Sequence, residues 1–171
     1  MSTEPRIVER TAQPYVAITA KATMQNLGEV VPPLNQEVFG WLAAHGAQPS
    51  GGPPFWKYNV VDMERGLEIE AGVTTRQAVE GDGRVHAGFL PAGRYATLRH
   101  VGHPMTLMDA TARLLRWADE QGLKWDVTES PDGERWTARL EFYLTDPREQ
   151  PDMNAWEAEL AFRLADGNGS A

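Results

Sequence analysis

The sequence contains no cysteine. This absence excludes disulfides, a thiol nucleophile and a thiolate-bound metal, and it suits a reducing compartment. No stretch approaches about 18 uninterrupted apolar residues, the length that a transmembrane helix requires. The opening residues "MSTEPRIVER" lack the apolar segment of a signal peptide. We therefore expect a cytoplasmic protein that does not enter a membrane.

Positive charge is also scarce. The chain has 16 Lys and Arg residues against 24 Asp and Glu, which gives a net charge of -8 at pH 7. Binding to a phosphate backbone needs clustered basic residues, and neither a basic stripe nor a helix-turn-helix pattern is present. These features argue against a nucleic-acid partner and favour a neutral or cationic one.

Catalytic and metal-binding motifs are few. The serines lie in predicted loops or near the termini, without a nucleophile-elbow pattern. His100 and His103 are close in sequence, but further metal ligands are missing around them. We predict neither a metal site nor a cofactor.

Two stretches repeat one another. "GWLAAHG" (40–46) matches "RWADEQG" (116–122) in the position of its Trp and in its final Gly. Apolar residues at helical spacing precede each stretch, which predicts two amphipathic helices. Prolines at 32–33 and 104 suit a first helical turn, and Gly46 and Gly122 suit the position after the last turn.

The predicted elements give an α+β fold made of two similar halves. We expect strands at about 6–22, 54–62, 67–76, 84–101, 135–146 and 155–165, in a mostly antiparallel sheet backed by the two helices. The order strand, helix, strand, strand then occurs twice in one domain (1–171), as pseudo-repeats of about 5–76 and 84–165. Chance similarity between amphipathic segments is the alternative. Segment 128–136 is predicted to be a hairpin turn or an exposed loop, and 166–171 a disordered tail.

The stretch "ARLEFYLTDP" (138–147) has the alternation of a strand. Three of its apolar side chains would face a core: Leu140, Phe142 and Leu144. Glu141 would face the other way. Its polar neighbours Arg139 and Thr145 allow an ordinary solvent-facing surface, whereas Tyr143 and the six tryptophans of the chain allow an aromatic cavity. Both alternatives stay open on the pattern alone.

Four segments together resemble a known family: "GPPFWKYNVVDMERGLEIEAGV" (52–73), "LPAGRYATLRHVG" (90–102), "LLRWADEQGL" (114–123) and "LEFYLTDPREQP" (140–151). Their order is similar to that in the GyrI-like small-molecule-binding superfamily, over about residues 5–165. This superfamily includes effector-binding domains of multidrug-responsive transcription regulators and a gyrase inhibitor. The resemblance implies a pocket lined by aromatic residues between pseudo-symmetric halves, with Glu141 projecting into it. It also implies a stand-alone module, since the chain has no room for a DNA-binding domain. Relatives often have Trp at the position of Leu140.

A carboxylate among aromatic rings is costly to ionise, so the pKa of Glu141 should rise. A cationic ligand would compensate by ion pairing and by cation–π contacts worth about 0.5–2 kcal/mol per ring. The candidate ligand-binding residues are Phe55, Trp56, Tyr58, Tyr95, His100, Trp136, Glu141 and Tyr143. The alternatives without a ligand are that Phe55 and Trp56 anchor the core and that Tyr95 is an ordinary strand residue.

We therefore expect a protein that captures hydrophobic, aromatic or cationic compounds. Some proteins resembling this family hydrolyse electrophilic, cyclopropane-bearing natural products, so a hydrolase with Glu141 as its catalytic general base is the alternative. A third possibility is a protein-interaction role like that of the gyrase inhibitor.

Overall fold

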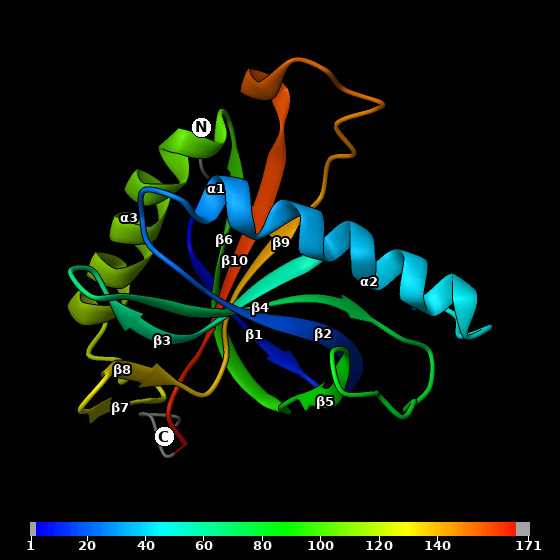
Figure 1. The fold of residues 1–171 in the computed structure, drawn as a ribbon. Helices are drawn as coiled ribbons and strands as arrows, with labels where there is room; N and C mark the ends of the chain where they lie inside the picture. The colour runs from blue at the N-terminus through cyan, green and yellow to red at the C-terminus, as the bar shows by residue number, and fades with distance from the viewer. Residues whose placement is uncertain (1–2, 167–171) are drawn as a thin grey trace.

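The computed structural model describes residues 3–166 (Figure 1). Its strands are β1 (Arg6–Arg10), β2 (Gln13–Ala22), β3 (Phe55–Asp62), β4 (Gly66–Thr74), β5 (His86–Leu90), β6 (Gly93–Val101), β7 (Val127–Ser130), β8 (Gly133–Trp136), β9 (Arg139–Tyr143) and β10 (Glu157–Arg163). Its helices are α1 (Leu27–Val30), α2 (Pro32–Ala44), α3 (Leu107–Glu120) and the short 3-10 helices η1 (Pro104–Thr106) and η2 (Met153–Ala155). The predicted α+β class, with two main helices and an antiparallel sheet, is confirmed. Of the predicted disordered tail, 167–171 lie outside the described residues.

The two main helices begin and end where proline and glycine permit. Pro32 and Pro33 occupy the first turn of α2, where a backbone N–H has no partner within the helix. Gly46 and Gly122 follow α2 and α3 with φ values of 66° and 70°, in the left-handed region that glycine adopts without strain. The local signals for the helix ends are thus the ones that the structure uses.

The strand order of the sheet is β1-β6-β10-β9-β3-β4-β2-β5, and all neighbours pair antiparallel. Exchanging β1 with β5, β2 with β6, β3 with β9 and β4 with β10 gives the same order read backwards. The first and second halves of the chain therefore contribute equivalent strands. They meet at the β9–β3 pair in the centre of the sheet.

Two predicted long strands are each two strands in the structure. The segment predicted as 6–22 breaks between β1 and β2, and the one predicted as 84–101 breaks between β5 and β6. At each break the chain changes partners, since β1 pairs with β6 and β5 pairs with β2. Each half thus adds its first strand to the other half.

The predicted strand 135–146 is also divided, into β8 and β9. The register of β3 shifts between Tyr58 and Val60, and β3 pairs with β9 before this bulge and with β8 after it. The predicted hairpin in 128–136 is the β7–β8 pair, with Ser130 paired with Gly133 at its tip.

Both main helices lie on one face of the sheet. Val38 and Leu42 of α2 pack against Val16 and Val73 of the outer strands. Ala110 and Leu114 of α3 belong to a cluster with apolar side chains of β6, β10 and β3: Leu98, Leu160, Phe162, Trp56 and Tyr58. Figure 1 shows the two helices flanking the central strands on either side. The opposite face carries a separate core.

That second core joins strands from both ends of the sheet: Tyr15, Leu90, Tyr95, Leu140 and Phe142 are among its members. Because β2 and β5 lie at one end and β6 lies near the other, the sheet must curl to bring them together. The curl buries this face in the second core, which we call the closed core. The two main helices lie on the other face, the helix-bearing face.

We expect Leu114→Ala to lower the free energy of unfolding by about 2–5 kcal/mol, because it leaves a cavity between α3 and the sheet. Leu114 is 0% exposed, whereas Met108 on the same helix is 57% exposed. Met108→Ala is the matched control and should change stability by less than about 0.5 kcal/mol. Urea unfolding measures both, and equal losses would contradict the assignment of the buried face of α3.

Candidate functional site

Glu141 lies at the centre of the sheet. It pairs with Trp56 across the β9–β3 junction. Its neighbours Leu140 and Phe142 are buried in the closed core, as predicted, so Glu141 projects from the helix-bearing face. The alternation of apolar and polar residues in 138–147 therefore predicted that Glu141 lies on the face opposite Leu140 and Phe142.

The Trp56–Glu141 pair is the middle one of the three residue pairs that join β3 and β9. On either side of it, Phe55 pairs with Phe142 and Lys57 pairs with Leu140. Tyr58 and Tyr143 each lie two residues beyond the central pair on their own strands and therefore share its face. The sheet thus brings one tyrosine from each half of the chain to the same carboxylate.

Both tyrosines donate hydrogen bonds to one oxygen of Glu141. The Tyr143 hydroxyl lies 2.5 Å from Oε1, and the Tyr58 hydroxyl lies 3.0 Å from the same atom. No described residue donates a hydrogen bond to Oε2. One oxygen is thus held in place while the other keeps its capacity to accept from a guest.

Trp56 forms the wall beside this carboxylate. Its ring lies edge-on to that of Tyr143, with 4.9 Å between centroids. Its Nε1 donates to Oδ1 of Asn35 at 2.8 Å, and the Asn35 amide donates to the carbonyl oxygens of Phe55 and Gly72. Buried Asn35 therefore fixes α2 to the sheet and fixes the orientation of the indole.

The surroundings hold the pKa of Glu141 above its ordinary value. Burial is the largest cause, and the hydroxyls of Tyr143 and Tyr58 and the charge of Arg139 oppose it. Burial and the nearby carboxylate also raise the pKa of both tyrosines well above the usual range, which keeps them as proton donors in the hydrogen bonds.

Glu70 on the opposite face gives an instructive contrast. Its carboxylate accepts from Tyr15 and Asn59 and forms an ion pair with Lys57, at 3.0 Å between Oε2 and Nζ. Although burial opposes it, the Lys57 charge with these hydrogen bonds lowers the pKa of Glu70. No described cationic side chain forms such an ion pair with Glu141. Of these two acids, Glu141 is the one whose charge has no ion-pair partner among the described residues.

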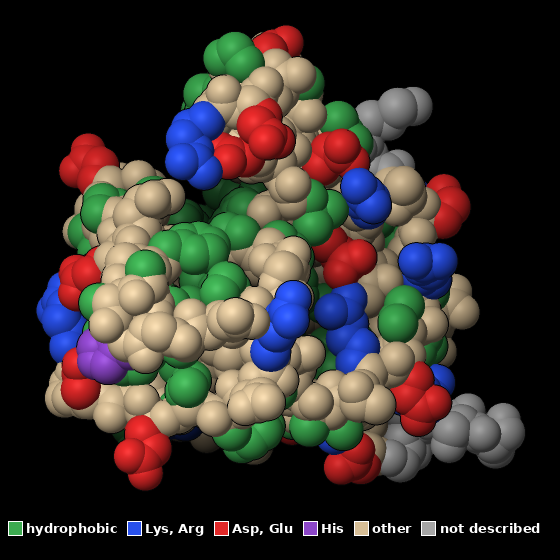
Figure 2. Space-filling view, turned by 90° about the vertical axis from the view of Figure 1, so that its right-hand side faces the viewer, with side chains coloured by type: hydrophobic (Ala, Val, Ile, Leu, Met, Phe, Trp, Pro, Cys, Tyr) green, Lys and Arg blue, Asp and Glu red, His purple; other side chains and the backbone are tan. Residues whose placement is uncertain are grey.

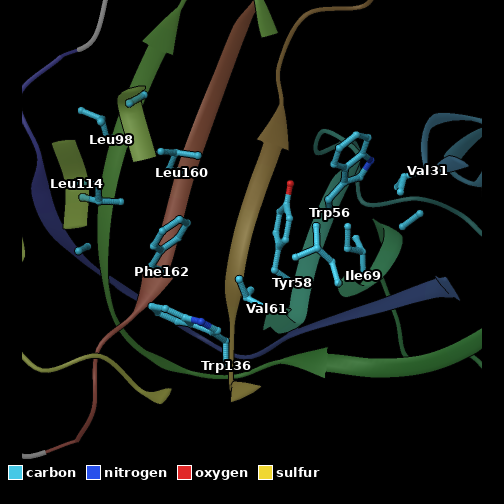
Figure 3. Close-up of a cluster of buried hydrophobic side chains, with 14 of the residues drawn as sticks. Val31, Trp56, Tyr58, Val61, Ile69, Leu98, Leu114, Trp136, Leu160 and Phe162 are labelled. Carbon is cyan, nitrogen blue, oxygen red and sulfur yellow. The ribbon is translucent and has the colours of Figure 1, made fainter. Parts of the chain in front are cut away.

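The site is partly open to solvent, because Glu141 and Tyr143 are only half-buried. The aromatic side chains around them are buried: Trp56, Tyr58 and Trp136 are 9%, 8% and 6% exposed. Figure 3 shows Trp56 and Tyr58 on β3 projecting to the same face as Phe162 and Leu160 on β10. In Figure 2 the segment 144–156, which follows β9 and projects at the top of Figure 1, overhangs a hollow with a hydrophobic floor.

The structure brings together only some of the predicted ligand-binding residues. Phe55 is fully buried in the closed core, and Tyr95 lies in the same core with its hydroxyl donating to the carbonyl of Pro91. Both face away from Glu141, so their prediction as pocket residues is corrected. The physical reason is strand alternation: Phe55 precedes Trp56 and must point to the other face.

Trp136 and His100 lie on the face of Glu141 but further from it. Trp136 is grouped with Tyr58 and Phe162 in one cluster. His100 lies in the cross-strand row of Tyr143, with Ala158 of β10 between them. Its Nε2 is 2.7 Å from Oγ1 of Thr106, which ties it to the start of α3.

Two recesses elsewhere do not include Glu141. One of about 650 Å³ lies at the turns between β1 and β2 and between β5 and β6, beside Arg10 and Arg163. The other, of about 220 Å³, lies along α3 beside Arg113 and Trp117. None of the described helices has both the length and the apolar character of a membrane span.

Two residues of the site, Asn35 and Arg139, were not among the residues predicted from the sequence. Asn35 interrupts the apolar stripe of its helix directly after Leu34, and this interruption was the available signal. Arg139 shares the strand face of Glu141 by its spacing of two, but its surroundings depend on strand pairing.

The raised pKa of Glu141 predicts a pH-dependent stability. The folded state binds this proton more tightly than the unfolded chain does, so the stabilisation is present below about pH 4.5 and is lost as the pH rises through the folded pKa. Glu141→Gln, which mimics the protonated acid, should be more stable than the parent at pH 8, and this advantage should shrink towards pH 4. Urea unfolding at the two pH values tests this, with Glu129→Gln on the exposed side of β7 as the control. The same pH response in both variants would contradict the electrostatic description of the site.

Comparisons with solved structures identify several with the same fold. The C-terminal domain of EcmrR superposes with a TM-score of 0.73 at 16% sequence identity, over 95% of this chain and 97% of that domain. In the EcmrR–DNA complex the chain spans 57% of the EcmrR chain. A hydrolase from Listeria innocua gives a TM-score of 0.65 at 14% identity, over 95% of this chain and 92% of the other.

A third similar structure contains a ligand. SAV2435 bound to tetraphenylphosphonium gives a TM-score of 0.61 at 9% identity, over 96% of this chain and 95% of that one. At these identities the likeness shows a shared fold. Among curated protein sequences there is no significant match. The GyrI-like small molecule binding domain family matches residues 3–165, nearly the whole sequence, and the chain therefore belongs to that family.

Proposed function

We propose that this small-molecule-binding domain captures hydrophobic, aromatic or cationic compounds on the helix-bearing face of its sheet, at Glu141. The observation that carries the proposal is the state of this carboxylate. It is held by Tyr58 and Tyr143, lies beside Trp56, and has no ion-pair partner among the described residues. A guest that supplies positive charge or a hydrogen-bond donor would give the carboxylate this missing partner.

The energetics favour a flat or ring-bearing guest. A partly desolvated carboxylate is costly, and an approaching cation recovers part of that cost by ion pairing. The faces of neighbouring aromatic rings add cation–π attraction, about 0.5–2 kcal/mol per ring. Because Asn35 fixes the Trp56 indole in advance, little side-chain entropy is lost when a ring packs against it.

The comparisons support this class of ligand. SAV2435, which has the same fold, was observed with tetraphenylphosphonium, a hydrophobic cation surrounded by aromatic rings. The family is described as small-molecule binding. We therefore choose this cation as the first probe for the chain.

Glu141→Gln should weaken binding of tetraphenylphosphonium about tenfold or more, the equivalent of about 1.4 kcal/mol. Binding of triphenylphosphine oxide, a neutral compound with similar rings, should change much less. Calorimetric titration of both compounds measures the difference. Glu129→Gln removes a charge on the exposed side of β7 and is the matched control. Equal weakening of the two compounds would show that Glu141 does not act through its charge.

A hydrolase is the second candidate, and the raised pKa of Glu141 favours it. An acid whose pKa is raised is a better general base, and no described residue donates a hydrogen bond to Oε2, the oxygen that would accept the proton from water. The likeness to a hydrolase from Listeria innocua is consistent with this candidate. The substrate would be an electrophilic, cyclopropane-bearing compound that a water molecule opens.

Product formation separates the two candidates. If the chain is a hydrolase, incubation with a cyclopropane-bearing electrophile gives the water adduct over many turnovers, and Glu141→Gln abolishes it while Glu129→Gln does not. Mass spectrometry of the mixture measures the adduct. Stoichiometric binding of the compound without product would leave the binding function and rule out hydrolysis of this substrate.

A further inference from the structure

Arg139 places a second polar group beside Glu141. Its guanidinium carbon lies 4.8 Å from the ring centroid of Trp136, 4.8 Å from that of Phe162 and 5.8 Å from that of Tyr58. The side chain is half-buried, and burial lowers its pKa. No described residue accepts a hydrogen bond from it or forms an ion pair with it. Ring faces attract the charge, but they do not replace strong hydrogen-bond acceptors.

The indole beneath this guanidinium has an unpartnered donor of its own. Trp136 is 6% exposed, and its Nε1 is buried without a hydrogen-bond partner among the described residues. Buried polar groups in folded proteins nearly always have a partner, so a lone buried donor needs an explanation. Here the lone donor adjoins a cation that also has no acceptor.

Arg139 and Glu141 do not neutralise each other by direct contact. They are two residues apart on β9 and share one face, which separates their Cβ atoms by about 7 Å. Tyr58 lies between them, since its hydroxyl donates to Glu141 and its ring contacts Arg139. The face therefore has an acceptor end at Glu141 and a donor end at Arg139 and Trp136, joined by aromatic rings.

We propose that the ligand is an aromatic compound carrying an acidic group, preferably a carboxylate, which pairs with Arg139 and the Trp136 Nε1–H. The aromatic body then lies against Tyr58 and Trp56, and a basic or hydrogen-donating group at its other end reaches Glu141. This inference rests on the function proposed above and narrows it. A simple lipophilic cation satisfies only one end of the site, whereas an amphoteric aromatic compound satisfies both.

Four probes with one ring system test this assignment: 2-naphthylmethanol, 2-naphthylmethylammonium, naphthalene-2-carboxylate and 6-(aminomethyl)naphthalene-2-carboxylate. Calorimetric titration should give the tightest binding for the last compound. Arg139→Met keeps the length of the side chain and should weaken both carboxylates at least tenfold, without weakening the ammonium probe. Trp136→Phe keeps a ring but removes the donor, and it should weaken both carboxylates about threefold.

Arg135→Met is the matched control, because Arg135 is an exposed arginine on β8 whose acidic partner is Asp132. It should change none of the affinities. The inference is overturned if Arg139→Met weakens the carboxylates no more than this control does, or weakens all four probes equally. If Arg139→Met does not fold, as judged by its thermal unfolding, Trp136→Phe replaces it, and unchanged carboxylate binding in that variant overturns the inference.

The two proposals fail in different ways. If the ammonium probe binds and depends on Glu141 while the carboxylates ignore Arg139 and Trp136, the site stands and the acidic-group inference falls. If no probe binds, including the neutral alcohol, the proposed function at this face falls and the inference falls with it.

Discussion

The two hydrogen bonds that converge on Glu141 depend on one constraint, the register in which β9 meets β3. With Trp56 opposite Glu141, the tyrosines two residues away on each strand fall on the same face and reach the same oxygen. A slip of one residue would turn Tyr58 and Trp56 into the closed core. The site is therefore a product of how the two halves of the chain join, and neither half contains it alone.

The closed core makes this register firm. Phe55 and Phe142 are paired across the same junction and buried on the opposite face, so a slip would expose them to solvent. The helices add a second restraint, because Asn35 of α2 holds both the β3 backbone and the Trp56 indole. Burial on one face thus fixes the position of an acid without an ion-pair partner on the other face. Glu70 and Glu141 differ in their partners. Glu70 has its own lysine, whereas Glu141 has only neutral hydroxyls and a more distant arginine.

The sequence predicted those features that depend on local periodicity or on family resemblance. The α+β class and the two helices follow from apolar residues that recur every three to four positions. The side of the strand on which Glu141 lies follows from alternation every two positions. The partners of β1 and β5 could not be predicted, because pairing between distant strands has no local signal. Phe55 and Tyr95 were misplaced for a related reason: the central strands are buried on both faces, so aromatic character does not tell which face a residue occupies. Arg139 was visible as a neighbour of Glu141, but its ring contacts come from β3, β8 and β10.

The central claim is that guests bind at the junction of the two halves, against Glu141. A crystal structure of the chain with tetraphenylphosphonium tests it most directly. We expect the cation on the helix-bearing face, with a phenyl ring against Trp56 and the phosphorus within about 6 Å of the Glu141 carboxylate, a range suited to direct electrostatic attraction. Density for the cation in the recess beside Arg10 and Arg163, with none near Glu141, would contradict it.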